Sequence, residues 1–502
     1  MSTKRIRFTS PSVTKPLKVL VDLKPALDGY SGIPQESRLL FAALLGMSNQ
    51  FEVEGLIQHG SRLLQPNVKP HRNKQPFDYA DLSAITSFNA RPRARYPQLI
   101  RNHLERISAQ VLVRTQALVG LRQTPYRLAS QHHPDFIWHT LFSKSLASQD
   151  LNKVTQAPYK IIRTPKKHYF SAGLLAYKWG LKPRFPKLNT QAHDVLIAQT
   201  PYPARISPNT QLVVRYHDAI PLLMPHTIKD NAFHQASHYH ALARNVKDGA
   251  WFVCVSESSR QDLLKFFPEA ESRANVIYDI VSDAYFDEDT DPSCIGQIIR
   301  KRLHQPQGIP KPLVAESVEY LLMVSTLEPR KNHLLLVSAW EQLKESGHPN
   351  LKLVIVGNPG WDYKSILDAF KPWQESGDLY HLTNVPADEL RKLYKHAQVT
   401  VCPSLAEGFD YSGVEAMNSG GIVAASDIPV HREVYKAAST YFNPYDKSDA
   451  ATAISQLLKS SNEERLALKA TGKQLGSHYQ RASLGQQWQA FLHNTFCTSN
   501  SV

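Results

Sequence analysis

The second half of the chain alternates short apolar runs with stretches of helical pattern, and this alternation limits its possible folds more than any other feature. Apolar runs lie near residues 320, 353, 379, 399 and 422, and helical stretches separate them. Strands made of continuous apolar residues are buried on both faces, as in a parallel sheet covered by helices on each side. We therefore predict a doubly wound α/β domain over residues 313–482.

A similar alternation occurs in the first half, over residues 17–58 and again over 194–286. It predicts a second doubly wound domain within residues 1–312. The intervening segment, 61–190, is rich in Pro, Arg, His and Gln, and no clear turn signals divide its apolar patches into helices and strands. We therefore interpret it as a basic insert. The linker-like stretch 300–312 separates the two domains, which we expect to face each other across a cleft.

The composition is that of a globular protein, with 502 residues, 42% apolar and 20% charged. No apolar run reaches the length of about 18 residues that a membrane span needs. The basic, hydroxyl-rich N-terminal tail, residues 1–18, precedes an apolar stretch too short for a signal peptide, so it is either a frayed tail or a transit peptide. Cys254 and Cys402 lie in apparent core strands, as free thiols do in a reducing compartment. We expect a cytoplasmic protein.

Glu407 and Glu415 frame the segment EGFDYSGVE, which joins a predicted strand to a predicted short helix. Ligands bind at the carboxyl ends of the strands in an open parallel sheet. Two carboxylates there suit a sugar nucleotide, because one can accept hydrogen bonds from hexose hydroxyls and the other from ribose hydroxyls. The first backbone amides of the helix would face phosphate. These amides belong to Tyr411, Ser412 and Gly413.

Arg330 and Lys331 stand between another apolar strand and the helix that follows it. The free N–H groups of a helix entrance and two fixed cations make a good diphosphate site. An isolated Arg-Lys pair usually marks only a solvated turn. Here the paired glutamates follow at a corresponding strand end of the same predicted domain, which favours the diphosphate interpretation.

Several segments match one family in combination. They are SGI (31–33), YHDAIPL (216–222), VSESSRQDLL (255–264), EPRKN (328–332), LVIVGNPGW (353–361), E-x7-E (407–415) and GGIVAASDIPVHREV (420–434). Together they resemble the retaining glycosyltransferases of family GT4, which have the GT-B fold of two Rossmann-like domains facing across a cleft. The resemblance spans residues 17–58 and 194–480 and leaves 61–190 unassigned.

The resemblance implies a role for each matching residue. Glu407 would contact the transferred sugar and Glu415 the ribose of the nucleotide. Arg330 and Lys331 would hold the donor diphosphate and stabilise the charge that develops as the nucleotide leaves. Two residues would act from the N-terminal domain. His217 would line the cleft near the sugar and the acceptor, and Gly32 would let the backbone approach the diphosphate.

The chain departs from the family pattern at two places. Ser325 and Thr326 replace the Gly-Arg pair of many members, so Arg330 would carry more of the phosphate contact. Within the E-x7-E loop, Asp410, Tyr411 and Ser412 replace the usual small and proline residues, and Asp410 and Tyr411 are therefore candidates for donor selection. The last segment, 483–502, has a helical pattern, and the resemblance implies that it returns to the N-terminal domain.

The resemblance implies transfer of a hexose, with retention at the anomeric carbon, to a saccharide or lipid-linked saccharide acceptor in surface polysaccharide biosynthesis. The EPRKN variant and the PGW turn favour mannose, with GDP-mannose as the donor. No cofactor or metal is implied, and the D-x-D spacing in DEDTD (287–291) lacks a preceding buried strand. The alternatives are a GT-B relative with epimerase or phosphorylase activity and a nucleic-acid-binding protein, although few aromatics accompany the basic segment.

The net charge of +14 is concentrated between residues 91 and 130, where eight arginines accompany one acid, Glu105. Within it, Ile107, Val111 and Leu118 fall near one stripe of a predicted helix. One interpretation is a helix that lies on an anionic membrane and meets a lipid-linked acceptor. The other is a helix packed on the N-terminal domain with solvated arginines.

Overall fold

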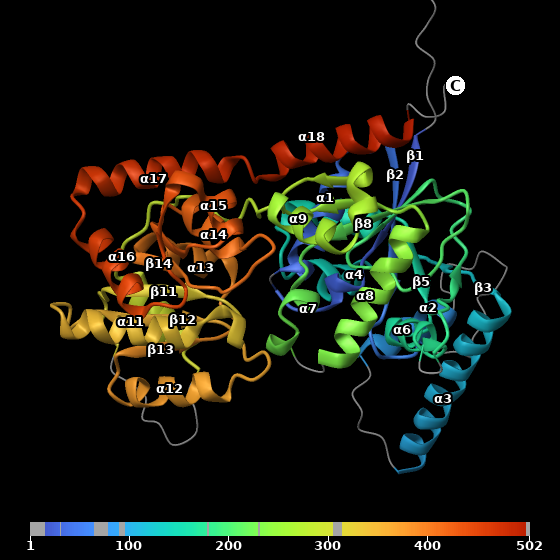
Figure 1. Ribbon diagram of the computed structural model, residues 1–502, viewed down its shortest axis with the longest axis horizontal. Coiled ribbons are helices and arrows are strands. Elements are labelled where there is room, and N and C mark those ends of the chain that lie inside the picture. Colours follow the sequence, from blue (N-terminus) through green and yellow to red (C-terminus); the bar gives the residue numbers. More distant parts are fainter. Residues whose placement is uncertain are drawn as a thin grey trace, which may run out of the picture.

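Two α/β domains lie side by side in the computed structural model (Figure 1). It describes residues 16–30, 32–64, 79–89, 96–177, 180–228, 231–304 and 314–497. The N-terminal tail up to residue 15 and the segment 91–95 of the basic stretch lie outside these ranges. Within the described parts, no helix combines the length and the apolar character needed to cross a bilayer.

The first domain is built on an eight-stranded sheet with the order β10-β9-β8-β7-β1-β2-β5-β4. Its strands are β1 (Leu17–Asp22), β2 (Phe51–Gln58), β4 (Tyr126–Leu128), β5 (Tyr159–Ile162), β7 (Val195–Ala198), β8 (Gln211–Tyr216), β9 (Trp251–Cys254) and β10 (Ala274–Val276). All neighbours are parallel except β4, which runs antiparallel to β5. Every residue of β7 is buried, as expected for a strand covered on both faces.

The helices of the first domain cover both faces of this sheet (Figure 1). They are α1 (Ile33–Leu45), α2 (Tyr79–Asn89), α3 (Tyr96–Val119), α4 (Pro134–Ile137), α5 (Leu151–Gln156), α6 (Lys166–Gly173), α7 (Ile220–Leu223), α8 (Asn231–Lys247) and α9 (Glu257–Phe266). The two short strands β3 (Arg122–Gln123) and β6 (Lys187–Leu188) form a separate parallel pair. Ser256 caps α9 through its side chain, as its position before the helix predicts.

The segment 61–190 is not a simple insert. Its strand β5 pairs in parallel with β2 and extends the main sheet, and β4 closes that edge. The interpretation of 61–190 as an insert is therefore wrong for its strands. These strands are hard to recognise from local patterns, because their apolar runs are short and each pairs with a strand more than 30 residues away in the chain.

The second domain has a six-stranded sheet that is parallel throughout, with the order β13-β12-β11-β14-β15-β16. The strands are β11 (Tyr320–Val324), β12 (Lys352–Val356), β13 (Leu379–Leu382), β14 (Val399–Cys402), β15 (Val423–Ser426) and β16 (Ser439–Phe442). Its helices are α10 (Cys294–Arg302), α11 (His333–Glu345), α12 (Lys364–Glu375), α13 (Ala387–His396), α14 (Tyr411–Asn418), α15 (Pro429–Tyr435), α16 (Lys447–Lys459) and α17 (Asn462–Ser477). The continuous apolar runs thus form a covered parallel sheet.

The second domain begins earlier than residue 313. Helix α10 packs against α13 and β13, and a Cβ on its Gly296 would lie 2.2 Å from the carbonyl oxygen of Ala315. Arg302 of α10 forms an ion pair with Glu389 of α13. The predicted boundary at 312 and the linker-like stretch beginning at residue 300 are therefore placed too late, because α10 belongs to the second domain.

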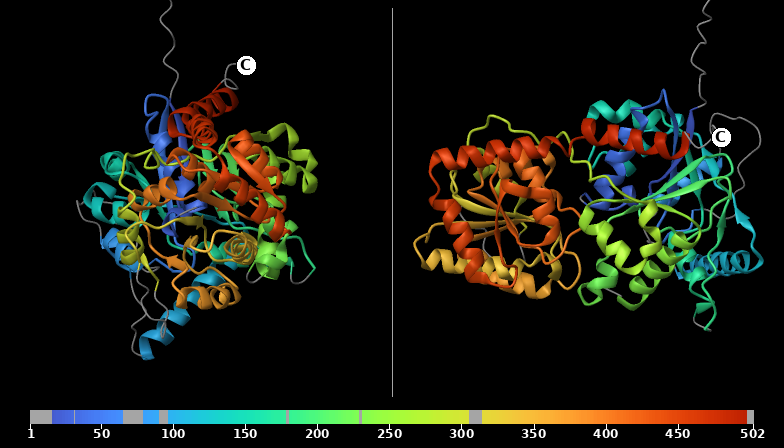
Figure 2. Two further views of the ribbon diagram at one scale, coloured as in Figure 1. Left: turned by 90° about the vertical axis from the view of Figure 1, so that its left-hand side faces the viewer. Right: turned by 45° about the horizontal axis from the view of Figure 1, so that its top comes forward.

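The chain crosses between the domains twice, and the two crossings touch. The backbone N–H of Val281 donates to the carbonyl of Tyr479 at 2.8 Å, and Val281 pairs with Gln480 in a parallel bridge. After the second crossing, α18 (Arg481–Leu492) lies on the first domain, as both Figure 1 and Figure 2 show. Its Trp488 is fully buried, with the guanidinium of Arg215 5.5 Å from the ring centre.

Each sheet reverses its winding direction at one pair of strands, β1 and β7 in the first domain and β11 and β14 in the second. Ligands of open α/β sheets bind outside the carboxyl ends of strands at such a point. The loops that follow these strands line a cleft between the domains, with a volume of about 1160 Å³. The fold therefore indicates that ligands bind in this cleft.

The cysteines stay unpaired in the described structure. Cys254 on β9 and Cys402 on β14 are buried free thiols, which confirms their predicted place in core strands. The acidic stretch 287–291 is paired with α13. Asp287 lies 2.8 Å from Lys395, and Glu288 lies 2.7 Å from Arg391. These acids therefore link the segment after the first crossing to α13.

Candidate active site

The cleft gathers the predicted site residues from four separate parts of the chain. Every one of them except Gly413 lines it. These residues are Gly32, His217, Arg330, Lys331, Glu407, Asp410, Tyr411, Ser412 and Glu415. Residues separated by more than 300 positions in the sequence thus share one surface.

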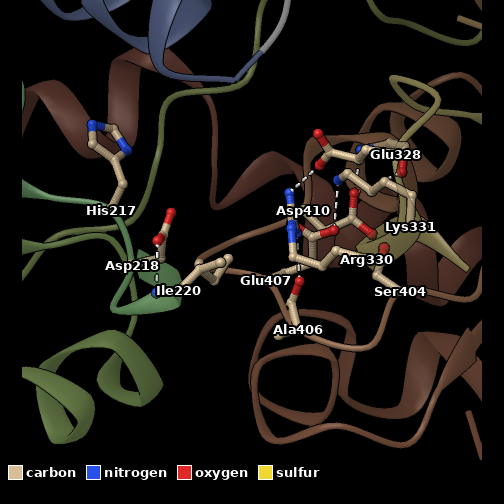
Figure 3. Close-up of polar contacts among 12 residues, drawn as sticks. His217, Asp218, Ile220, Glu328, Arg330, Lys331, Ser404, Ala406, Glu407 and Asp410 are labelled. Atoms are coloured by element: carbon tan, nitrogen blue, oxygen red, sulfur yellow. Dashed lines mark hydrogen bonds and ion pairs between the residues drawn. The ribbon is translucent and has the colours of Figure 1, made fainter. Parts of the chain in front are cut away.

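Glu407 follows β14 and is held by the two cations that follow β11 (Figure 3). Its carboxylate lies 2.7 Å from Arg330 Nη1 and 2.5 Å from Lys331 Nζ. Burial raises the pKa of Glu407, but the charges of Arg330 and Lys331 outweigh burial and hold this pKa below its usual value. Glu407 is therefore an ionised, buried carboxylate with both oxygens paired.

Arg330 is itself fixed by its own domain. Its Nη2 lies 2.7 Å from Glu328 Oε1, and its Nη1 also donates to the carbonyl of Ala406. Lys331 and Arg330 together face two carboxylates, Glu328 and Glu407, which balance their positive charge. Burial raises the pKa of Glu328, which Arg330 partly offsets. A guanidinium with this many fixed partners is already oriented before a ligand arrives.

Gly408 joins Glu407 to the opposite wall of the cleft. A Cβ at this position would lie 2.0 Å from the carbonyl oxygen of His217, so only glycine permits the approach. Ser256 Oγ, at the start of α9, donates to the Gly408 carbonyl at 2.7 Å. The glycine directly after the first glutamate of the motif therefore sets the distance between Glu407 and the first domain.

His217 and Asp218 follow β8 and line the cleft from the first domain, and Figure 3 shows them across from Glu407 and its cations. His217 Nδ1 lies 4.0 Å from Asp279, and Nε2 is buried with no hydrogen-bond partner. Burial lowers the pKa of His217 well below its usual value, so the ring is neutral. Asp218 accepts from the backbone N–H of Ile220 at 2.9 Å, and burial raises its pKa although Arg330 opposes this.

Gly32 precedes α1 and has a φ of 69°. A Cβ there would meet nothing within 4 Å, so the backbone conformation and not space explains the glycine. The unusual conformation starts α1 at Ile33 on the wall of the cleft. The start of a helix presents unpaired N–H groups, as a phosphate ligand requires.

Glu415 lies in the second turn of α14 and contacts the other domain. Gln35 Nε2 of α1 donates to its Oε1 at 3.0 Å, and Tyr394 Oη donates to its Oε2 at 3.1 Å. Burial raises the pKa of Glu415 to about 7, although Gln35 and Tyr394 favour the ionised form. A side chain of the first domain thus hydrogen-bonds to the carboxylate predicted to bind ribose.

The carboxylate of Asp410 is hydrogen-bonded to neighbouring residues of the second domain and does not point freely into the cleft. Its φ is 67°, and it caps α14 by accepting from the N–H of Ser412 at 3.2 Å and from the Ser412 hydroxyl at 2.7 Å. The other oxygen lies 3.1 Å from His431 Nε2. The Ser412 amide, predicted to face phosphate, is therefore already bonded to Asp410.

Tyr411 and Gly413 make contacts that hold α14 against neighbouring helices. Tyr411 Oη donates to Glu36 of α1 at 3.3 Å, a second contact between α1 and α14. A Cβ on Gly413 would lie 2.3 Å from the ring of Tyr435. Gly413 therefore allows α14 to pack on α15, and it does not line the cleft with the other predicted residues.

Sequence reasoning did not select several residues that shape the site. Glu328 fixes Arg330, and Gln35 holds Glu415. Lys24 and Lys144 of the first domain line the cleft around Asp28, with Lys24 Nζ 2.5 Å from its carboxylate and Lys144 Nζ 2.7 Å from its carbonyl. Glu328 stands inside the EPRKN motif, whereas nothing in the pattern around the other three distinguishes them from surface residues.

Part of the chain matches a known protein family. Residues 305–475 match the family described as Glycosyl transferases group 1. The serotype-specific mannosyltransferase WbdA of Escherichia coli is 33% identical over 138 residues, which are 27% of this chain and 17% of WbdA. The O-antigen chain mannosyltransferase RfbU of Salmonella typhimurium strain LT2 is 28% identical over 260 residues, 50% of this chain and 65% of RfbU. The chain thus spans less than two thirds of these relatives.

Solved structures share the architecture over nearly the whole chain. Sucrose-phosphate synthase from Thermosynechococcus elongatus aligns with a TM-score of 0.59 at 14% identity, covering 96% of this chain and all of that one. Anabaena HepE in complex with UDP aligns with a TM-score of 0.55 at 14% identity, covering 95% and 100%. These likenesses and the two sheets, parallel except for the edge strand β4, confirm the predicted fold class, the α/β GT-B fold with two Rossmann-like domains.

Proposed function

We propose that this protein is a hexosyltransferase that moves a sugar from a nucleotide-sugar to a saccharide acceptor. The observation that carries the proposal is the buried Glu407 carboxylate held by Arg330 and Lys331 at the strand ends where the second sheet reverses. A sugar nucleotide brings hydroxyls for the carboxylate and a diphosphate for the cations. The match of residues 305–475 to the Glycosyl transferases group 1 family supports the same reaction class.

The reaction breaks the bond between the anomeric carbon and a diphosphate oxygen. The nucleoside diphosphate leaves with the bonding electron pair, the acceptor oxygen bonds to the anomeric carbon, and the leaving diphosphate takes up the proton of the acceptor hydroxyl. Arg330 and Lys331 stabilise the negative charge that grows on the diphosphate, and fixed cations do this without reorganisation during the reaction. Both are already held by Glu407, and Arg330 also by Glu328.

Glu407 accepts hydrogen bonds from the hydroxyls of the transferred sugar, and Glu415 accepts from the ribose. Gly32 begins the helix that brings backbone N–H groups near the diphosphate from the other wall. His217 lines the wall opposite Glu407, and its role in this proposal is to contact the sugar or the acceptor. Closing of the two walls around the donor excludes water from the anomeric carbon.

Mannose from GDP-mannose is the proposed donor. The relatives WbdA and RfbU are both described as mannosyltransferases, and RfbU as an O-antigen chain enzyme. By that likeness, the proposed acceptor is a saccharide or lipid-linked saccharide of surface polysaccharide biosynthesis. We also propose that the reaction takes place in the cytoplasm. We also propose membership of family GT4, with retention at the anomeric carbon and no metal or other cofactor.

A donor screen tests the proposal. The purified chain is mixed with GDP-mannose, UDP-glucose, UDP-N-acetylglucosamine and their free nucleotides, and its melting temperature is measured. A ligand that binds only the folded state raises the melting temperature. The preferred donor is then incubated with saccharide acceptors, and released nucleoside diphosphate is measured for the wild type and for Glu407→Gln.

We expect GDP-mannose to give the largest shift and the wild type alone to release GDP at a measurable rate. The matched control is Glu271→Gln, whose side chain is 75% exposed and distant from the cleft, and it should keep wild-type activity. Binding and turnover of no sugar nucleotide, with wild type and Glu407→Gln alike, would reject the proposal. The anomeric configuration of the product, read from its NMR coupling constants, decides between retention and inversion.

A further inference from the structure

Helix α3 projects from the first domain at the end farthest from the second domain (Figures 1 and 2). It packs on α6 through one face, where Ala109 and Val113 are buried. This contact agrees with the interpretation of α3 as a helix of the first domain. The opposite face is exposed, and its composition is unusual for a solvated face.

The outward face of α3 carries an apolar stripe. Leu104, Ile107, Val111 and Leu118 follow one another at spacings of three, four and seven residues, which places them on one side of a helix. Their exposed fractions are 60%, 44%, 53% and 54%. Leu112 and Val119, also exposed, border this stripe. A soluble helix normally presents polar residues on the side away from the core.

This clustering is confined to one part of the described surface. Of the eighteen large apolar side chains exposed there, seven lie between residues 104 and 121. Others stand singly, such as Leu466 on α17 and Leu334 on α11. Single exposed apolar residues need no explanation, whereas a contiguous exposed patch marks an interaction surface.

The charge around the stripe indicates the partner. Residues 96–130 contain five arginines and a single acid, Glu105. Arg122 and Arg127, just past the end of α3, are exposed, and Lys182 and Arg184, in the segment after α6, are exposed as well. Leu181 beside them is 63% exposed. An apolar stripe bordered by cations matches the interface of an anionic lipid bilayer, where apolar side chains enter the acyl boundary and cations remain among the headgroups.

We infer that α3 is a membrane-docking helix that lies flat on an anionic lipid surface through its stripe of Leu104, Ile107, Val111 and Leu118. The inference does not depend on the proposed transferase activity, because it rests on exposure and charge at the far end of the first domain. Together with that activity, it would keep the cleft near an acceptor anchored in the same membrane. An anionic bilayer offers many lipid phosphates to these arginines. A protein partner or a second copy of this chain would have to bind the same arginines without lipid phosphates.

Vesicle flotation with the full chain tests the inference. One set of vesicles contains phosphatidylcholine alone, and the other contains phosphatidylcholine and phosphatidylglycerol. We expect the protein to float with the anionic vesicles, and added salt to release part of it by screening the arginines. The double variant Ile107→Asp/Val111→Asp should lower the floating fraction at least about fivefold, because two apolar side chains no longer enter the lipid.

The matched control is Leu466→Asp, which changes a leucine of similar exposure, 66%, on α17. It should float as the wild type does. The melting temperature of each variant shows that folding is unchanged, which is expected because the substituted side chains are exposed. A second variant, Arg122→Gln/Arg127→Gln, should weaken binding to anionic vesicles and reduce its salt dependence.

Three results would overturn the inference. The first is absence of flotation with either kind of vesicle. The second is equal flotation with neutral and anionic vesicles, which would remove the role of charge. The third is a wild-type dimer, detected by analytical ultracentrifugation, that Ile107→Asp/Val111→Asp converts to a monomer without any change in flotation, which would make the stripe a contact between copies.

Discussion

The two glutamates that frame the segment EGFDYSGVE are both buried, but their pKa values are shifted in opposite directions. Glu407, in the loop, faces two cations of its own domain, and its pKa lies below the usual value. Glu415, on α14, faces only neutral donors, one of them from the other domain, and burial raises its pKa to about 7. Charge on the neighbours, and not burial as such, decides which carboxylate stays ionised.

The difference also separates their expected roles. Glu407 and its cations form a unit that stays assembled whatever the position of the first domain. The hydrogen bonds of Glu415 depend on α1, because Gln35 belongs to the opposite wall. Glu407 and its cations therefore form a fixed charge arrangement for the sugar and diphosphate. The hydrogen bond of Glu415 to Gln35 instead forms only when the two walls of the cleft are close together.

The largest expected effect is at Glu407. Glu407→Gln removes the charge between Arg330 and Lys331 and should lower kcat about a hundredfold to a thousandfold, the usual result of removing an electrostatic contact to the transition state. The measurement is steady-state release of nucleoside diphosphate from the preferred donor. Glu271→Gln is the control, and a loss below tenfold would show that Glu407 is not needed for the chemistry.

A smaller effect is expected at Glu415. Glu415→Gln places an amide donor among the donors Gln35 and Tyr394, and it should weaken donor binding about tenfold, as an unsatisfied buried group does. The change should appear in the Kd of the donor, measured by titration calorimetry, while kcat stays close to wild type. A large loss of kcat with an unchanged Kd would move Glu415 from ribose binding into the chemistry.

The raised pKa of Glu415 predicts a pH dependence of binding. Below about pH 7 this carboxyl is mostly protonated and accepts poorly from ribose hydroxyls, and above it the ionised form accepts well. The Kd of the donor should therefore fall about fivefold between about pH 6 and about pH 8. Glu415→Gln should bind with no such dependence. A wild-type Kd that is constant over this range, or rises with pH, would contradict the assignment.

The smallest effect concerns the contact between the walls. Gln35→Ala removes one donor to Glu415 and should destabilise the unliganded fold by about 1 kcal/mol, the net value of one buried hydrogen bond. It should also tighten donor binding about twofold to threefold, because the ribose no longer displaces Gln35. Urea unfolding and calorimetry measure the two changes. A weaker Kd would mean that Gln35 helps to hold the donor and does not compete with it.

Sequence patterns predicted the parts of this structure that depend on local order. The continuous apolar runs identified both sheets, and the strand-loop-helix order placed Arg330, Lys331 and Glu407 at neighbouring strand ends. Each of these conclusions requires only the residues within one strand and its loop. The reversal of a doubly wound sheet then brings two such loops together, as a general property of the fold.

The remaining features depend on pairing between distant residues. Gln35 lies 380 positions from Glu415, and nothing around it in the sequence distinguishes it from a polar residue on a helix. Strand β5 has four residues, and only its pairing with β2 makes it part of the sheet. The side chain of Asp410 was predicted to select the donor, yet the distant His431 takes one of its oxygens. That selection remains a prediction.

The paired crossings at Val281 and Gln480 have a consequence for synthesis of the chain. Since α18 packs on the first domain, with Trp488 buried against it, that domain is complete only after the second domain has left the ribosome. Domains generally fold as units during synthesis, N-terminal first. Here part of the core of the first domain stays uncovered until α18 has been synthesised, almost two hundred residues later. Premature termination would therefore harm both halves of the molecule, including the half already made.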